Sequence, residues 1–271
     1  MPNKWEHLKR LKRAVGLPAA ASILFRRVIG LSDATSVRAG GHKIKVRPCD
    51  SDLFVLGQIF GEQEYEIGRY KSGLNNLALQ WKESGINPVV LDIGANVGYS
   101  ALYFADIFPH AIVCAVEANR STFDLLIRNV GGHPRIRAVH AAVWFHEQGV
   151  ELVSAADGVN GAGSGSWASK VKDGRLNLTP SLLLRSTYKQ IPNARPLVVK
   201  LDVEGAEREI CEAAFDVLSI APCILVEPHD FMLPGHSCLR YMLSALAGRA
   251  MDTLIQGENL MFVDSNLAGA V

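Results

Sequence analysis

The sequence has little of what would place it in a membrane or in the secretory pathway. Its 271 residues contain no apolar run approaching the roughly 18 residues that a membrane-spanning helix needs. The longest apolar candidate, residues 14–25, is interrupted by Pro18 and followed by Arg26 and Arg27, which also argues against a signal-peptide core. We therefore expect a cytoplasmic protein.

Cysteine is also scarce, and the positions of the cysteines do not indicate a disulfide framework. The sequence has five cysteines, at positions 49, 114, 211, 223 and 238. The number is odd, and the spacing matches neither a disulfide scaffold nor a zinc site. We expect reduced thiols, mostly within the core.

A broad excess of positive charge is missing as well. The formal net charge is +1, and it divides into +6 for residues 1–30 and −5 for the rest of the chain. An acidic main part argues against a nucleic-acid enzyme, which usually needs a basic groove. The basic segment carries Trp5, Leu8, Leu11 and Val15 at helical spacing. It fits weak peripheral contact with an anionic membrane, although docking of this helix on the main domain is the favoured interpretation.

What the sequence does have is a strand, a glycine turn, a helix and a second strand in succession. Residues 89–91 form a short apolar run that ends at Asp92 and suits a buried parallel strand. Gly94 allows a positive φ and close approach of the backbone to a ligand, and Gly98 allows a helix over residues 99–107 to pack near the strand. A second apolar strand, over residues 112–116, then follows, and after it a helix over residues 120–130 with Asn119 or Ser121 as its cap.

The polar residues of this unit indicate the kind of cofactor. Asn96 stands where a dinucleotide-binding turn would have a glycine, so a pyrophosphate fits poorly and a nicotinamide-dependent oxidoreductase is disfavoured. Asp92 can attract an ammonium group, directly or through water. Glu117, followed by Ala118, can accept hydrogen bonds from a ribose diol. S-adenosylmethionine carries both an ammonium group and a ribose.

A second block places charged groups at the ends of two further strands. Residues 197–202 read as a buried strand with the anomalous Lys200 inside it, and Asp202 on the same face is its nearest candidate partner. Glu204 follows, before a helix that we expect to reach about residue 219. The next strand, residues 223–227, leads into His229. Ligands of open α/β sheets bind at such strand ends.

These motifs resemble the FkbM family of S-adenosylmethionine-dependent methyltransferases. The resemblance rests on the turn over residues 92–98, on residues 116–119, and above all on Lys-x-Asp-x-Glu-Gly-x-Glu over residues 200–207. Upstream, residues 43–52 and 60–65 are similar to the strand and helix that lead into the cofactor domain. Ala118 departs from the family, which usually has proline there. The resemblance implies a methyltransferase that acts on an oxygen of a sugar or a polyketide-like natural product.

The fold expected from the pattern and the resemblance is α/β. We predict a Rossmann-like class I methyltransferase with a seven-stranded, mostly parallel sheet. An antiparallel hairpin near residues 251–263, preceded by a helix from about residue 235 to 247, is expected at its C-terminal end. The predicted division is an N-terminal extension over residues 1–84, helical up to residue 40 with a short strand near residues 43–47, and a cofactor domain over residues 85–271. A glycine-rich segment, residues 154–176, is interpreted either as an active-site lid containing Trp167 or as a surface excursion.

Methyl transfer to an alcohol needs positioning and a group that removes the proton. The candidates for catalysis are Lys200, Asp202, Glu204 and His229, with Glu227 as a further possible base, and His229 has the most suitable intrinsic pKa. The spacing of Asp202, Glu227 and His229 does not favour a metal, so none is predicted, although a divalent ion accepts these donor types. The expected function is therefore O-methylation of a sugar, glycan or secondary metabolite. A cofactor-binding module without activity is the alternative.

Overall fold

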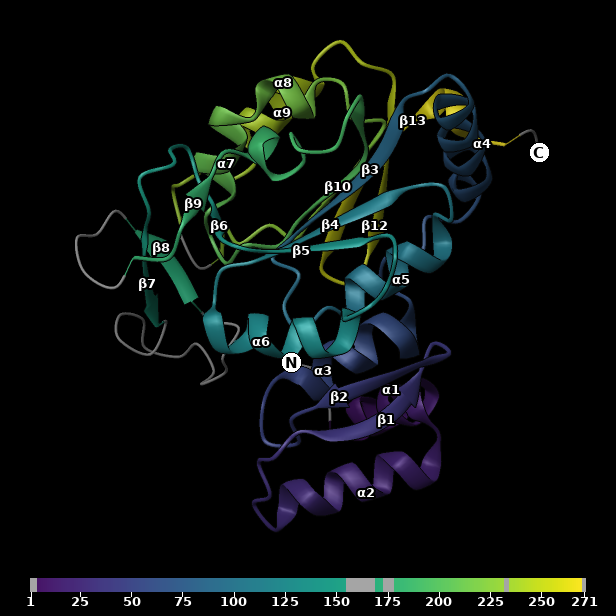
Figure 1. Ribbon diagram of the computed structural model, residues 1–271, viewed down its shortest axis with the longest axis vertical. Helices are drawn as coiled ribbons and strands as arrows, with labels where there is room; N and C mark the ends of the chain where they lie inside the picture. Colours follow the sequence, from purple (N-terminus) through teal and green to yellow (C-terminus); the bar gives the residue numbers. More distant parts are fainter. Residues whose placement is uncertain (1–3, 155–168, 173–177, 232–233, 270–271) are drawn as a thin grey trace.

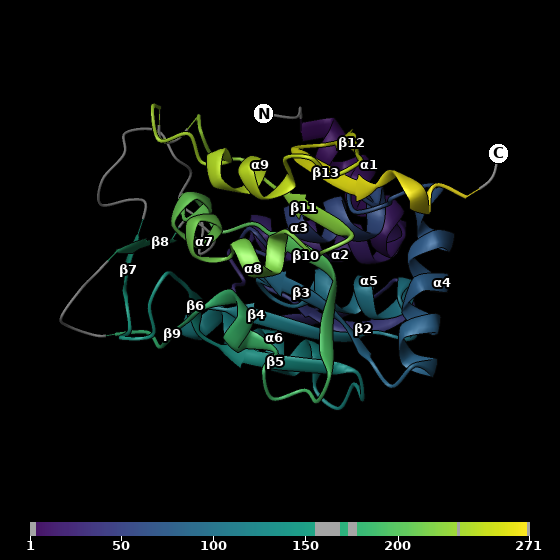
Figure 2. The same ribbon diagram turned by 90° about the horizontal axis from the view of Figure 1, so that it is seen from above.

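The computed structural model describes residues 4–154, 169–172, 178–231 and 234–269. Its centre is a seven-stranded sheet with helices on both faces (Figures 1 and 2). The strand order is β12 (Met251–Gln256), β13 (Asn259–Asp264), β11 (Cys223–Val226), β10 (Ala194–Leu201), β3 (Asn87–Ile93), β4 (Ile112–Glu117) and β5 (Ile136–His140). Strand β13 runs opposite in direction to all the other strands of this sheet. The predicted fold, with its closing antiparallel hairpin, is confirmed.

Alternation along the strands divides the interior into two layers. One face of the sheet is covered by α4 (Tyr70–Glu83), α5 (Tyr99–Ile107) and α6 (Arg120–Val130), and the other by α7 (Glu207–Ala213), α8 (Phe215–Leu218) and α9 (Arg240–Leu246) (Figure 1). Successive side chains of β3 point to opposite faces, so Val90 packs in the first layer and Leu91 in the second. Asp92 and Lys200 therefore share the face that carries α5.

The N-terminal region forms an additional layer beneath α5 and α6 (Figure 1). It contains α1 (Lys4–Val15), α2 (Leu17–Val28), the antiparallel pair β1 (Thr35–Ala39) and β2 (His42–Val46), α3 (Asp52–Leu56) and the π-helical η1 (Gly57–Glu62). Helix α1 buries Leu11 and Ala14 and leaves Lys12 and Arg13 exposed. Membrane contact by this segment stays a prediction.

Three local predictions were wrong. Residues 35–39 are not helical, because Gly40 and Gly41 adopt φ of +56° and +84° and turn the chain into the β1–β2 hairpin. The helix expected to reach residue 219 is broken at Ala214, whose φ of −111° lies outside the helical range. The helix expected from Gly235 starts at Arg240, since φ is +89° at Gly235 and +53° at Ser237.

The β1–β2 hairpin is linked to the glycine turn that follows β3 by a buried asparagine. Asn129 of α6 accepts a hydrogen bond from the backbone N–H of Lys45 at 2.7 Å and donates one to the carbonyl of Val97 at 2.8 Å. The Tyr99 hydroxyl donates to the carbonyl of Lys45 at 2.7 Å. Backbone groups of the hairpin and of the turn thus share one network.

Two short sheets lie beyond β5. Strand β6 (Ala142–Val143) pairs with β9 (Ser181–Leu182), and β7 (Glu151–Ser154) pairs with β8 (Ser169–Lys172). Most of the glycine-rich segment, including Trp167, lies outside the described residues, so its prediction as a lid stays a prediction. The described residues also contain the 3-10 turns η3 (Leu184–Thr187) and η4 (Ser265–Leu267).

All five cysteines are free thiols in the structure, four of them buried and Cys49 exposed. Among the described residues, none of the helices combines the length and the apolar character that crossing a bilayer requires.

Candidate functional site

The glycine turn after β3 is held close to the end of β10. Gly94 adopts φ of +75°, and a Cβ built there would lie 1.8 Å from the carbonyl oxygen of Asp202. Its N–H donates to the carbonyl of Val116 at 3.0 Å, and its own carbonyl accepts from Lys200 Nζ at 2.7 Å. Only glycine fits this conformation and this approach. Gly98 adopts φ of +86°, and a Cβ there would meet Val130 and Leu126 of α6, so this glycine lets α5 start against α6. The sequence predicted close packing of this helix on the strand instead.

Glu117, at the end of β4, reaches back to this turn. Its Oε2 accepts from the backbone N–H of Asn96 at 3.0 Å, and its Oε1 accepts from the N–H of Asn119 at 2.7 Å. A carboxylate has about four acceptor positions. Each oxygen of Glu117 therefore keeps capacity for one more donor, such as a hydroxyl of a diol.

Burial makes this carboxylate sensitive to pH. Desolvation raises the pKa of Glu117 to about 7, against the opposing effect of the hydrogen bonds from Asn119 and Asn96. Glu117 therefore changes its protonation state near neutral pH.

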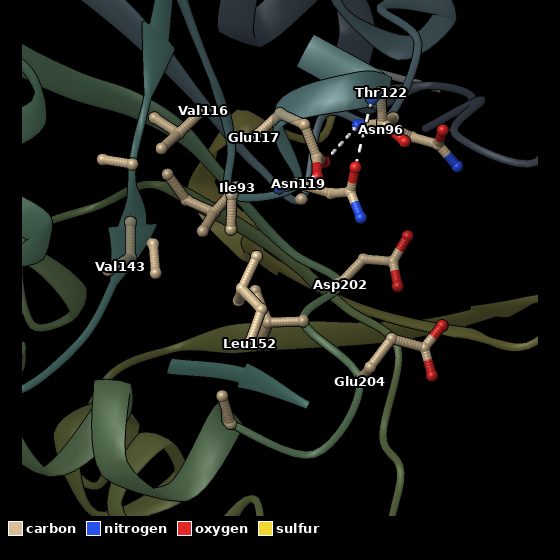
Figure 3. Close-up of a pocket in the computed structure, with 16 residues that line it drawn as sticks. Ile93, Asn96, Val116, Glu117, Asn119, Thr122, Val143, Leu152, Asp202 and Glu204 are labelled. Atoms are coloured by element: carbon tan, nitrogen blue, oxygen red, sulfur yellow. Dashed lines mark hydrogen bonds between the residues drawn. The ribbon is translucent and has the colours of Figure 1, made fainter. Parts of the chain in front are cut away.

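A cavity of about 700 Å³, counted with its opening to solvent, lies beside the turn and Glu117 (Figure 3). Its walls come from the ends of β3 and β4, from the segments that follow β3, β4, β5 and β10, and from β6 and β7. The lining residues that carry the argument are Gly94, Asn96, Glu117, Ala118, Asp202 and Glu204.

Lys200 lies beneath the turn with carboxylates on two sides. Its Nζ is 3.2 Å from Asp202 Oδ2 and 3.3 Å from Asp92 Oδ1, and its side chain is 2% exposed. Burial lowers the pKa of Lys200, but the neighbouring Tyr65 and these two carboxylates outweigh it and raise the pKa, so the ammonium stays charged. The predicted Lys200–Asp202 pair is confirmed. Asp92 was not anticipated as a partner.

Asp92 has a different setting from the one expected of a cofactor ligand. It is fully buried, accepts a hydrogen bond from Ser100 Oγ at 2.7 Å, and lines neither of the two cavities described in this section. Its contacts are with Lys200 and the first turn of α5. This arrangement supports an indirect role for Asp92, which helps to hold the glycine turn in place.

A second cavity, of about 400 Å³ with its opening to solvent, lies between η1 and the sheet. It shares Gly94, Asn96 and Asp202 with the first cavity, so the two meet at the turn. Most of its lining is polar. The polar residues are Gln58, Glu64, Asn96, Ser100, Lys200, Asp202, Glu227 and Asn259, and the apolar side is formed by Val55, Ile59 and Tyr65.

His229, just after β11, is surrounded by glutamates. Its Nδ1 is 2.6 Å from Glu207 Oε1, and both side chains are buried. Its Nε2 lies 3.6 Å from Glu227 Oε1 and 3.7 Å from Glu204 Oε2. Glu204 adopts φ of +51°, an uncommon conformation for a residue with a side chain, and such strain is frequent at functional sites.

The charges around His229 determine its protonation. Burial lowers its pKa, but the hydrogen bond to Glu207 and the nearby carboxylates raise it to about 9. At neutral pH the imidazole of His229 is therefore protonated. A protonated imidazole cannot accept the proton of a hydroxyl, so this state does not fit the role of base that its intrinsic pKa suggested. Desolvation, followed by the charge of Asp202, raises the pKa of Glu227 to about 8.

The structure thus gathers the sequence-predicted residues at one edge of the sheet. Gly94, Asn96, Glu117 and Ala118 line the first cavity, Asp202 lines both, and Lys200 lines the second. Sequence reasoning missed the partner of His229, Glu207, and the contribution of η1 to the second cavity. The spacing of Glu204 and Glu207 near the start of a helix was the only signal available for the former.

Comparison with protein-family models identifies one match. The model described as the methyltransferase FkbM domain matches residues 92–249, more than half of the chain. This range contains the glycine turn, Glu117, the Lys200 motif and His229. No curated protein sequence matches the chain.

Solved structures show only distant similarity. A fibrillarin pre-rRNA processing protein from Methanococcus jannaschii is 12% identical with a TM-score of 0.37, and the match covers 65% of this chain and 65% of that protein. An O-methyltransferase from Bacillus cereus in complex with SAH is 13% identical over 71% of this chain and 80% of that one, with a TM-score of 0.38. The O-methyltransferase TomG from Streptomyces achromogenes is 15% identical over 71% and 79%, also with a TM-score of 0.38. Similarity at this level says nothing about what the chain methylates.

Proposed function

The chain belongs to the FkbM family of S-adenosylmethionine-dependent methyltransferases, and from this premise we propose that it methylates a hydroxyl group of a sugar or glycan. The observation that carries the proposal is the junction of two cavities at the glycine turn. The first cavity contains Glu117, whose carboxylate can accept hydrogen bonds from a ribose. The second cavity is lined by polar groups that suit a methyl acceptor with hydroxyl groups.

We place the adenosyl part of the cofactor in the first cavity. The oxygens of Glu117 that do not bond to Asn96 and Asn119 would accept from the ribose hydroxyls. The methionyl part would pass Gly94, whose close approach to Asp202 brings the sulfonium near the second cavity. Acidic groups at this point also favour a cationic cofactor.

The second cavity fits a carbohydrate better than an apolar polyketide or lipid. Its lining is mainly polar, and polar groups in a cavity orient a ligand rich in hydroxyls. Outside the lining of this cavity, Phe231 is 77% exposed, and its ring centroid is 6.0 Å from that of His229. An exposed ring beside polar groups provides an apolar platform for one face of a sugar.

The reaction requires the acceptor oxygen, the methyl carbon and the sulfur in line. The new bond joins the oxygen to the methyl carbon, the electron pair of the broken bond stays on sulfur, and the hydroxyl proton must be removed. We assign the proton to Glu204, which lines the first cavity. Its Oε2 lies 3.7 Å from Nε2 of His229, and Oε1 of Glu227, which lines the second cavity, lies 3.6 Å from the same nitrogen. The alternative, a module without activity, expects an acceptor cavity filled by side chains.

The function is tested by methyl transfer from labelled S-adenosylmethionine to a panel of free sugars and glycans. We expect transfer to at least one of them and a rate about 100-fold lower in Glu204→Gln, because a general base contributes at least this much. Cofactor affinity should remain near that of the wild type. Glu212→Gln, which changes an exposed acid in α7, is the matched control. Cofactor binding without transfer to any acceptor would favour the inactive module.

Cofactor affinity should depend on pH through Glu117. Protonation below its pKa of about 7 weakens the acceptor, so the dissociation constant of S-adenosylmethionine should rise as pH falls from 8 to 6, by about tenfold. Calorimetry at each pH measures this change. In Glu117→Gln we expect weaker binding without that dependence. If the dependence persists in this variant, another group such as Glu64, whose pKa burial also raises to about 7, is responsible.

A further inference from the structure

Three side chains of metal-binding type meet at the ends of β10 and β11. Asp202, Glu227 and His229 each offer a ligand atom, and these atoms all lie within 4.8 Å of one another. The two strands are parallel neighbours, so their carboxyl ends bring these side chains to one place. Two carboxylates and an imidazole are donors that divalent transition-metal ions accept.

The orientation of His229 supports metal binding independently of the carboxylates. Glu207 fixes the imidazole through Nδ1 at 2.6 Å, so that Nε2 points toward Glu204 and Glu227. The oxygens there are 3.6 and 3.7 Å away, beyond hydrogen-bond distance, although the His229 side chain is only 3% exposed. A metal-ligating histidine is typically held through its other nitrogen by such a carboxylate.

A buried amide at the same place provides a second observation. Asn259 is 2% exposed, lines the second cavity together with Asp202 and Glu227, and has no hydrogen-bond partner for its Oδ1 among the described residues. The next residue, Leu260, pairs with Val226, which immediately precedes Glu227. Amide oxygens are accepted by hard divalent cations, and a buried amide oxygen without a partner is costly.

The local charge also favours a cation. Among the described residues, the acidic side chains around the site are Asp92, Asp202, Glu204, Glu207 and Glu227, and they form ion pairs with Lys200 and His229. Lys200 lies between Asp92 and Asp202. Glu204, Glu207 and Glu227 each lie within ion-pair distance of the imidazole of His229. A divalent cation would offset this excess of negative charge.

We propose that Asp202, Glu227 and Nε2 of His229 bind one divalent cation that accepts both carboxylate and imidazole ligands, such as Mn²⁺. The role of the ion rests on the proposed function, because it would bind the acceptor hydroxyl and lower its pKa before methyl transfer. Its binding does not depend on that function. The sequence predicted no metal because spacing along the chain does not reveal how β10 and β11 align.

The test is a titration of the full-length, chelator-treated chain with Mn²⁺ alone, followed by electron paramagnetic resonance of the free ion. We expect one saturable equivalent in the wild type and at least tenfold weaker binding in Glu227→Gln and in His229→Gln. Glu207→Gln keeps the side-chain size but removes the carboxylate that holds His229, and loss of such support costs about 10-fold to 100-fold in affinity. Asp106→Asn, an exposed carboxylate 2.8 Å from His42, is the control and should bind like the wild type.

Two results would overturn the proposal: no saturable Mn²⁺ binding to the wild type, or equal affinities in Glu227→Gln and the Asp106→Asn control. Circular dichroism of each variant separates loss of the site from loss of the fold. Calorimetry with S-adenosylmethionine in the same preparations separates the two conclusions. Cofactor binding without Mn²⁺ binding contradicts only the metal, and Mn²⁺ binding without cofactor binding contradicts only the proposed function.

Discussion

Lys200→Met should lower the free energy of unfolding by about 3–5 kcal/mol, the usual cost of leaving a buried charge without its partner. The substitution keeps an unbranched side chain of similar length, so the packing changes little. It removes the ammonium from between Asp92 and Asp202 and leaves the fully buried Asp92 with a hydrogen bond from Ser100. It also removes the donor to the carbonyl of Gly94. Denaturant unfolding followed by circular dichroism measures the effect.

A double-mutant cycle with Asp92→Asn separates this charge effect from packing. The neutral amide that this substitution introduces needs no counter-ion, so Lys200→Met should cost less in that background than in the wild type. The difference should be at least about 1 kcal/mol. Equal costs in both backgrounds would show that the Lys200–Asp92 pair is not what stabilises this layer.

Gly94→Ala should destabilise the chain by at least about 3 kcal/mol or prevent folding. A positive φ costs about 1–2 kcal/mol for a residue with a Cβ. The new Cβ would also lie 1.8 Å from the carbonyl oxygen of Asp202, so β3 and β10 would have to separate at their ends. Thermal unfolding and the yield of soluble protein measure this effect.

Gly132→Ala is the matched control for that substitution. Gly132 has φ of +84°, and a Cβ there meets nothing within 4 Å. We expect only the cost of the backbone conformation, about 1 kcal/mol. If both variants lose the same stability, the close approach of the turn to Asp202 does not contribute.

The sequence was most informative where local pattern alone determines an element. The helices over residues 99–107 and 120–130 have the predicted bounds. Each consists of periodic apolar residues, and a start signal precedes it: a glycine before the first helix and an asparagine before the second. Asn119 caps the second of these helices by accepting from the N–H groups of Ser121 and Thr122. The predicted closing hairpin is also present.

Pairs across strands were harder to predict, since their partners depend on register. Lys200 lies opposite Asp92 in the pairing of β10 with β3. The alternation within residues 197–202 indicated Asp202 as a partner, but no pattern within one strand shows which residue of another strand lies beside it. The same reason hid the alignment of Asp202 with Glu227 and His229.

The protonation of His229 depends on neighbours that the sequence did not reveal. An isolated histidine titrates near neutrality, which suggested a base. Glu207 belongs to α7 and follows a turn with positive φ at Glu204 and Gly205. This turn directs the side chain of Glu207 toward the imidazole of His229. The charge of this carboxylate then raises the pKa of His229.

The shared network of Asn129 bears on how the chain can be divided for experiments. A shortened protein starting at residue 85 would lack Lys45. Asn129 would then lose the backbone N–H from which it accepts a hydrogen bond, and Tyr99 would lose the carbonyl to which it donates one. Both orphaned groups belong to helices that begin or end beside the glycine turn. Such a fragment would therefore report on a perturbed glycine turn, and cofactor affinities measured with it would underestimate those of the intact chain.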